Sequence, residues 1–282
     1  MSDNPFRSDA PVQFPPAHHL LHDLPAEFEH VGRTLARAHL RIDPTDQLSA
    51  VADLLVAVDV LSGLLVGGVV APDWMATSNL SLQLTPVPTS EVVVASVEVV
   101  RVGRTSVVVD VALADATASG DPIGAGVCSF TRLERRSSNL HLAPVQPGER
   151  TVLGGLTGRP GAVVAGSVLL EPHDASGSTQ VEIDPWSRNS FGAMNGGVVA
   201  AAAVRSAVRA VRARSAERFV VSELVLHYLA PATVGPLRCD SSVVRSDAHG
   251  LALRVDLLDE GRVDEDMGPR RVAIGEVAVQ PA

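Results

Sequence analysis

The segment Asn189–Ala200 combines residue types that can stabilise a developing negative charge. It reads Asn-Ser-Phe-Gly-Ala-Met-Asn-Gly-Gly-Val-Val-Ala and runs into a helix-like stretch. Two glycines at a helix start leave backbone N–H groups unobstructed and without intrahelical acceptors, and the helix dipole adds partial positive charge there. Such a helix start can polarise a carbonyl group and stabilise an oxyanion. The alternative is that Gly196 and Gly197 only permit close packing of the helix on a sheet.

Asp59 is an acid inside the otherwise apolar run Leu54–Ala71. Burial in an apolar helix raises the pKa of a carboxyl group and makes its carboxylate a better general base. The alternative is a buried, hydrogen-bonded Asp that holds the helix to a loop. The run has 18 residues, near the minimum for a membrane span, but no basic flank follows it. We therefore expect a helix buried inside the protein and no membrane partner.

Phrases from the front of the chain recur in its rear, in the same order. An Asp-Pro pair precedes an apolar helix, a strand then ends at a proline, and a Val-Val-Arg phrase follows. The matched positions are Pro44 and Pro185, Pro86 and Pro231, and Arg101 and Arg245, which stand 141, 145 and 144 residues apart. A nearly constant period over the same order of elements indicates an internal duplication.

Each half predicts one long apolar helix followed by a meander of strands. The expected strands are 91–102, 104–114 and 123–133 in the first half and 236–245, 251–258 and 271–280 in the second, with turns at 103–104, 248–250 and 259–261. A helix against a strongly curved antiparallel sheet is a small layered α+β fold. Residues 134–151 are rich in charge, Ser and Pro and predict a linker. This leaves a flexible tail at 1–16 and two halves at 17–133 and 152–282.

The composition excludes several classes of protein. The formal net charge of −9 argues against a nucleic-acid partner, because phosphate binding needs a basic stripe. Two cysteines, Cys128 and Cys239, cannot form a disulfide framework or a zinc site, and we expect both to be reduced core residues. His18, His19 and His22 lack a second ligand pair, so neither a metal nor a cofactor is expected. The N-terminus lacks the order of a signal peptide, which favours a cytoplasmic protein.

The segment Asn189–Ala200 resembles the Asn-x-x-Gly-x-x-His-Gly-Gly signature of hotdog-fold acyl-CoA thioesterases, in particular the phenylacetate-degradation type. Asn195 stands where the family has its usual His. The strand phrase Leu224–Pro231 and the meander after it also follow the family's order. The family pattern fits the chain as two successive copies, which together cover most of it. It implies a double hotdog, with two curved antiparallel sheets that each wrap a long apolar helix, and an acyl-CoA substrate. Hotdog units often pair further, so a homodimer or larger homo-oligomer is expected.

The two halves depart from the family pattern in opposite ways. The family's water-activating carboxylate lies eight residues after the first glycine of the pair, where this chain has Val204. The first half has the acid at the matching position, Asp59, but it has Ala50–Ala52 where the second half has Asn195, Gly196 and Gly197. A family site takes its loop from one hotdog and its acid from the partner. The resemblance therefore implies one complete composite site per chain.

The resemblance also assigns roles at this site. The Gly196 N–H, or that of Gly197, would bind the thioester carbonyl oxygen, and the Asn189 amide would orient the carbonyl or the water. Asp59 would act as general base on water or, less readily, as the nucleophile. Gly197 and Asn195 would contact the substrate.

A Ser or Thr about eighteen residues after the acid is the family's third element, and it maps to Thr77, with Ser78 as the second choice. The alternative is a Thr at a strand start with no role. Arg101, Arg104 and Arg188 are candidates to bind the phosphates of coenzyme A, although exposed arginines are usually only solvated.

Two other functions fit parts of the pattern. A catalytically silent hotdog that binds acyl-CoA or an acyl carrier is favoured by the missing His and by the altered loop of the first half. An enoyl-CoA hydratase-like protein shares the fold, but it needs an Asp and a His in a loop that this sequence lacks.

Overall fold

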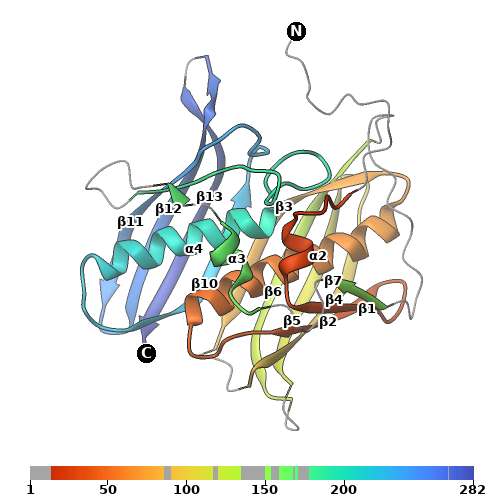
Figure 1. Cartoon of the computed structure of the whole chain (residues 1–282), viewed down its shortest axis with the longest axis horizontal. Coiled ribbons are helices and arrows are strands. Elements are labelled where there is room, and N and C mark those ends of the chain that lie inside the picture. The colour runs from red at the N-terminus through yellow and green to blue at the C-terminus, as the bar shows by residue number, and fades with distance from the viewer. Residues whose placement is uncertain are drawn as a thin grey trace.

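The computed structural model describes residues 14–85, 90–116, 120–134, 150–153, 159–167, 169–170, 178–265 and 267–282. It shows two similar halves side by side, each with a long helix lying on a curved antiparallel sheet (Figure 1). The first half contains α1 (Leu20–Asp23), β1 (Ala26–His30), β2 (Leu35–Arg41), α2 (Gln47–Val70), β3 (Trp74–Leu84), β4 (Val92–Val102), β5 (Ser106–Asp115) and β6 (Pro122–Leu133). The rest contains β7 (Arg150–Leu153), α3 (Ala162–Gly166), β8 (Leu169–Leu170), β9 (Thr179–Val181), α4 (Gly196–Arg212), β10 (Phe219–Tyr228), β11 (Leu237–Asp247), β12 (Gly250–Asp264) and β13 (Gly268–Pro281).

The strands form one continuous sheet of 13 strands, in the order β7-β1-β2-β4-β5-β6-β3-β10-β13-β12-β11-β9-β8. Outward from the β3–β10 pair, both halves repeat the same order of strands. The predicted α+β architecture with two curved sheets is therefore present, and the two sheets are joined edge to edge. In the ladder between β3 and β10, Ser81 lies opposite Val225, 144 residues later. A residue that faces its own repeat counterpart lies on a pseudo-twofold axis, and this confirms the duplication.

Helix α2 is the apolar helix that the sequence predicts, and it begins earlier than expected, at Gln47. The Asp46 side chain caps it by accepting a hydrogen bond from the Ser49 N–H. The helix is long and apolar enough to cross a membrane, but 72% of its most apolar stretch is buried inside the protein. Burial between its own sheet and α4 explains why polar residues are so rare along it.

Two expectations about the chain's organisation differ from the structure. Strand β7 spans the expected linker boundary and pairs with β1 of the first half. Residues 259–261 form no turn, because β12 continues to Asp264 and only its register shifts there. The Asp259 carboxylate is fully buried and accepts hydrogen bonds from the N–H groups of Thr233, Val234 and Gly235. The domain boundaries stay a prediction, and most of the expected tail and linker lies outside the described residues.

Candidate active site

Helix α4 begins at the predicted glycine pair, and Asn195 is its N-cap. The Asn195 Oδ1 accepts hydrogen bonds from the N–H groups of Gly197, at 2.9 Å, and Val198, at 3.3 Å. Asn is among the best N-cap residues, since its side chain satisfies N–H groups that have no intrahelical acceptor. The residue that replaces the family's His therefore holds the start of the helix. Within the described ranges, the Gly196 N–H has no acceptor and is free to bind a substrate oxygen.

Asp59 from α2 meets this helix start from the other half of the chain. The Thr77 hydroxyl on β3 donates a hydrogen bond to Asp59 Oδ1 at 2.7 Å, and the Gly197 N–H lies near enough to lower the pKa of the Asp59 carboxyl group. A Cβ placed on Gly196 would lie 2.9 Å from Asp59 Oδ1 and 3.1 Å from Thr77 Oγ1. The structure thus brings Asp59, Thr77 and Gly196 into one cluster.

The two glycines meet different surroundings. A Cβ on Gly197 would lie 2.5 Å from the Cα atom of Val56, because α4 crosses the backbone of α2 at that point. Gly197 therefore permits close helix packing, whereas Gly196 faces the polar cluster. The packing explanation therefore holds for Gly197, and a role of Gly196 toward an oxyanion stays a prediction.

Burial sets the protonation chemistry of the cluster. Asp59 is only 5% exposed, and desolvation raises the pKa of its carboxyl group above the usual range. The hydrogen bond from Thr77 and the nearby Gly197 N–H oppose this increase by stabilising the charged form. The buried Cys128 thiol lies near enough for its pKa to be raised, first by desolvation and then by the Asp59 charge. An Asp in this setting is a stronger base than a solvated one once it is ionised.

A bulge in β3 selects Thr77 over Ser78. Leu80 and Leu82 of β3 are buried, and simple alternation would put Ser78 on their side. The register between β3 and β6 shifts between Thr77 and Asn79, and this interruption of the alternation brings Thr77 to the side of Asp59 instead. The Ser78 hydroxyl donates instead to the Ser129 carbonyl at 3.1 Å. Of the two residues that the sequence offered, Thr77 is the one that touches the acid.

The loop before α4 is held by its own polar groups. The Asn189 Oδ1 accepts from the N–H groups of Phe191 and Ala193, so its oxygen shapes the loop. The Arg188 guanidinium donates to the carbonyls of Gly192, at 2.9 Å, and Ile183, at 3.1 Å. Both side chains fix the loop, and their roles toward a substrate stay predictions.

The other two predicted arginines, Arg101 and Arg104, are exposed at the turn between β4 and β5. Arg132 ties this turn to the start of β3, since its guanidinium donates to the Gly103 carbonyl and pairs with Asp73. Contact of Arg101 and Arg104 with the phosphates of coenzyme A also stays a prediction.

An aromatic pair joins the two halves beside the cluster. The ring of Trp74, at the start of β3, packs edge-on against that of Phe191 from the loop, with centroids 4.5 Å apart. Phe191 is 41% exposed whereas Trp74 is buried. The pair therefore places an apolar surface between β3 and the loop that precedes Gly196.

Tyr228 also reaches this site, and the sequence reading did not assign it a role. Its hydroxyl donates to the Gly196 carbonyl at 2.7 Å. The signal was its place in the strand phrase Leu224–Pro231, which marks β10 as the neighbour of β3. The contact itself depends on the cross-strand register and is not readable from spacing.

The positions equivalent to the cluster in the other half are apolar. Val204 stands in place of Asp59, and Ala50, Val51 and Ala52 stand in place of the helix-start residues; all four are buried. The pseudo-twofold axis thus relates one polar cluster to one apolar cluster.

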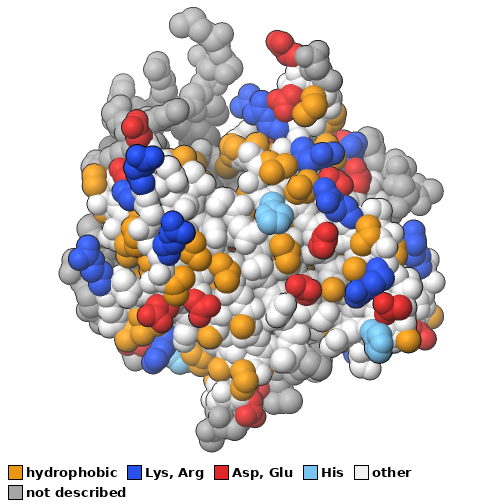
Figure 2. All heavy atoms as spheres, turned by 180° about the vertical axis from the view of Figure 1, so that it is seen from behind, with side chains coloured by type: hydrophobic (Ala, Val, Ile, Leu, Met, Phe, Trp, Pro, Cys, Tyr) orange, Lys and Arg blue, Asp and Glu red, His pale blue; other side chains and the backbone are white. Residues whose placement is uncertain are grey.

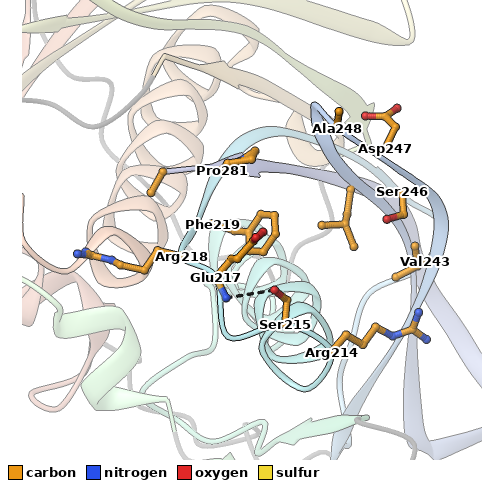
Figure 3. A pocket seen from close by; sticks show the side chains of 12 residues that line it. Arg214, Ser215, Glu217, Arg218, Phe219, Val243, Ser246, Asp247, Ala248 and Pro281 are labelled. Carbon is orange, nitrogen blue, oxygen red and sulfur yellow. Dashed lines mark hydrogen bonds between the residues drawn. The ribbon is translucent and has the colours of Figure 1, made fainter.

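An open pocket among the described residues lies elsewhere. It has a volume of about 720 Å³ and is lined by the end of α4, the β11–β12 turn and the C-terminus (Figure 3). Phe219 lies in its middle, with Glu217 beside it. A helix of 17 residues is roughly 25 Å long, so this pocket and Gly196 lie at opposite ends of α4. Among the described residues no group of His, Cys, Asp or Glu is placed to hold a metal ion.

Comparison with known proteins bears on the fold and on the kind of enzyme. Residues 183–275 match the family model of the acyl-CoA thioesterase N-terminal domain. None of the curated proteins compared matches the sequence. The match supports a thioester hydrolase, as the resemblance implied, while the phenylacetate type stays a prediction.

Solved structures show the same fold at low sequence identity. The tesB protein of Mycobacterium avium subs paratuberculosis has 12% identity and a TM-score of 0.57, over 90% of this chain and 95% of that chain. The 12:0-ACP thioesterase of Umbellularia californica has 13% identity and a TM-score of 0.58, over 88% of this chain and 94% of that chain. A protein with the hot dog fold from Alicyclobacillus acidocaldarius has 12% identity and a TM-score of 0.57, over 94% of this chain and 98% of that chain. The chain therefore has the double-hotdog fold, and its residues 183–275 are similar to the acyl-CoA thioesterase N-terminal domain.

Proposed function

We propose that this protein hydrolyses an acyl-CoA thioester at one composite site per chain, between its two halves. One observation carries the proposal: the Asp59 carboxylate of the first half, held by Thr77, faces the open first turn of α4 in the second half. A base and an oxyanion-binding N–H group then flank the same small space.

The proposed reaction begins when the thioester carbonyl oxygen accepts a hydrogen bond from the Gly196 N–H. Asp59 takes a proton from a water molecule, and the water oxygen bonds to the carbonyl carbon. The negative charge that develops on the carbonyl oxygen lies at the positive end of α4, where the helix dipole and the N–H group stabilise it. Thr77 holds Asp59 Oδ1, so the other carboxylate oxygen is directed toward the water.

The tetrahedral intermediate then collapses. The carbon–sulfur bond breaks, and the coenzyme A thiolate leaves with the proton that Asp59 had taken. A carboxyl group with a raised pKa suits both directions of this transfer, because it binds the proton tightly enough to receive it from water. The products are a carboxylic acid and free coenzyme A, and Asp59 returns to its ionised form.

Substrate binding follows from the surroundings of the cluster. The apolar pair Trp74 and Phe191 offers a surface to an acyl group, and Arg101 and Arg104 are exposed cations for the phosphates of coenzyme A. The relatives named above include an acyl-ACP thioesterase, so an acyl carrier protein is the other thioester source to assay.

The variant Asp59→Asn tests the proposal directly. It removes the base and keeps the shape of the side chain, so kcat for acyl-CoA hydrolysis should fall by roughly 100-fold or more. The matched control is Asp53→Asn, which changes another buried carboxylate on the same helix, one that binds the N–H groups of Gly161 and Val163. Release of free thiol is measured for both variants over a panel of acyl-CoA esters.

Unchanged turnover in Asp59→Asn would refute the proposed mechanism. Binding of acyl-CoA without turnover in the wild-type protein would favour the catalytically silent alternative.

We also propose that the protein is a cytoplasmic homodimer. The side of the molecule facing away from α2 and α4 shows hydrophobic side chains among the charged ones (Figure 2). Val100 on β4 is 59% exposed and Val244 on β11 is 62% exposed, so apolar surface is available for pairing. Sedimentation of the purified protein gives its oligomeric state.

A further inference from the structure

Tyr228 is the single tyrosine of the chain, and it binds the first peptide group of α4. Its hydroxyl donates to the Gly196 carbonyl oxygen at 2.7 Å. That carbonyl and the Gly197 N–H belong to the same peptide unit. The Gly197 N–H donates to Asn195 Oδ1 at 2.9 Å and lies near enough to Asp59 to lower the pKa of its carboxyl group. A chain of polar contacts therefore runs from Tyr228 through one peptide group to the carboxylate.

The hydrogen bonds in this chain reinforce one another. A donor at a carbonyl oxygen polarises the peptide unit and makes its N–H a better donor, and the effect is larger where water is excluded. Desolvation raises the pKa of Tyr228 well above its usual value, and the nearby Asp59 and Cys128 groups raise it further. These effects favour the protonated form of Tyr228, in which the hydroxyl is a donor.

The repeat supplies an independent comparison. With the offset of 144 residues seen between Ser81 and Val225, the counterpart of Tyr228 is Leu84. Leu84 has no hydroxyl, and the other half also lacks the counterparts of Asp59 and the glycine pair. The tyrosine is present at the polar cluster and missing at the apolar one. If the hydroxyl only held the sheet against the helix, we would expect one in both halves. Its presence only in the half-site that faces Asp59 therefore favours a role in the polar cluster.

We propose that Tyr228 is a positioning residue, which holds the Gly196 carbonyl and with it the first turn of α4 beside Asp59. The inference rests on the proposed function. Loss of the hydroxyl loosens this first turn, so that the Gly196 N–H is held less firmly toward the substrate oxygen and the Gly197 N–H less firmly toward Asp59, while the substrate-binding surfaces stay in place.

The variant Tyr228→Phe removes only the hydroxyl oxygen. The expected result is a fall in kcat of about tenfold, with KM for acyl-CoA within about twofold of wild type. The acidic limb of the pH–kcat profile should move up by roughly half a unit, because a weakened Gly197 N–H stabilises the Asp59 carboxylate less. Among the described residues, the titratable groups that face Asp59 are Cys128 on β6 and Tyr228 itself on β10, and both are neutral throughout this range.

The matched control is Ser206→Ala, which removes another buried hydroxyl from α4. Ser206 Oγ bonds to the Cys239 carbonyl and to Ser241 Oγ, on the side of α4 that faces β11. Ser206→Ala should have the wild-type kcat, and the acidic limb of its pH–kcat profile should lie at the wild-type position. A Tyr228→Phe variant with wild-type kcat and an unmoved limb would overturn the inference.

A second readout separates this inference from the proposed function. If the wild-type protein hydrolyses no thioester, the proposed function fails, and the Asp59 carboxyl is then titrated by ¹³C NMR. Its signal is assigned by its loss in Asp59→Asn. A higher Asp59 pKa in Tyr228→Phe than in wild type supports the positioning role without any turnover, and an equal pKa refutes it.

Discussion

The Asp59 carboxylate lies against Gly196 so closely that no side chain fits between them. A Cβ on Gly196 would stand 2.9 Å from one carboxylate oxygen and 3.1 Å from the other. The two residues are far apart in sequence and come from different halves of the duplication. Their contact turns an acid in one repeat and a helix start in the other into one site.

Substitution of the two glycines distinguishes the space that Gly196 leaves beside Asp59 from the close packing of α4 on α2 at Gly197. Gly196→Ala should keep the fold, because Ala is tolerated in the first turn of a helix, but its methyl group would displace Asp59 and lower kcat by roughly 100-fold. Gly197→Ala should instead destabilise the protein by about 1–3 kcal/mol, since its methyl group collides with the Val56 backbone. Thiol release and denaturant unfolding measure the two effects. Equal activity of Gly196→Ala and wild type would contradict the proposed site.

The Thr77 hydroxyl stabilises the ionised form of Asp59, so its removal should change the pH dependence of activity. The raised pKa means that Asp59 is protonated, and inactive as a base, below that pKa, and activity appears as the pH rises through it. In Thr77→Val this acidic limb should move to higher pH, and kcat should fall by about tenfold on the plateau. Thr77→Ser should restore both.

The neighbouring residue provides the control for this prediction. The Ser78 hydroxyl binds the Ser129 carbonyl, so Ser78→Ala should keep the wild-type pH profile. A shifted profile in Ser78→Ala with an unshifted one in Thr77→Val would reverse the assignment.

Asp53 predicts a pH dependence of stability that is independent of catalysis. Burial raises its pKa from 3.8 to about 6, against the hydrogen bonds it accepts from Val163 and Gly161. Between these values the folded protein keeps a proton that the unfolded chain has lost, so stability falls as the pH rises from about 4 to about 6 and then levels off. The loss is on the order of 3 kcal/mol.

Asp53→Asn should remove this dependence. The difference in unfolding free energy between wild type and variant, measured by denaturant titration from pH 4 to pH 7, should therefore change by about 3 kcal/mol. A difference that is constant with pH would show that Asp53 titrates normally.

Much of the fold was predictable because burial leaves periodic marks in the sequence. The duplication, the two apolar helices and the six long meander strands follow from period and composition, and the structure has all of them. The edge strand β7 has four residues, too few to show alternation. The cluster at Asp259 reads as a turn, because Asp, Glu and Gly favour turns, but buried backbone N–H groups bind its carboxylate.

The site was predictable as a set of residues, and its contacts were not. The opposite losses in the two halves pointed to Asp59 and Gly196, which lie together in the structure. The choice between Thr77 and Ser78 depends on a bulge, and a bulge leaves no periodic mark. Arg188 was a candidate phosphate ligand on the basis of residue type; its guanidinium binds two loop carbonyls, contacts that the sequence does not reveal, and its role toward a phosphate stays a prediction.

The most direct test of the composite site is a crystal structure with a non-hydrolysable acyl-CoA analogue, in which a methylene group replaces the thioester sulfur. The proposed function predicts one analogue per chain, with its carbonyl oxygen about 3 Å from the Gly196 nitrogen and a water between Asp59 and the carbonyl carbon. An analogue bound at the far end of α4, or at the apolar positions around Val204, would contradict it.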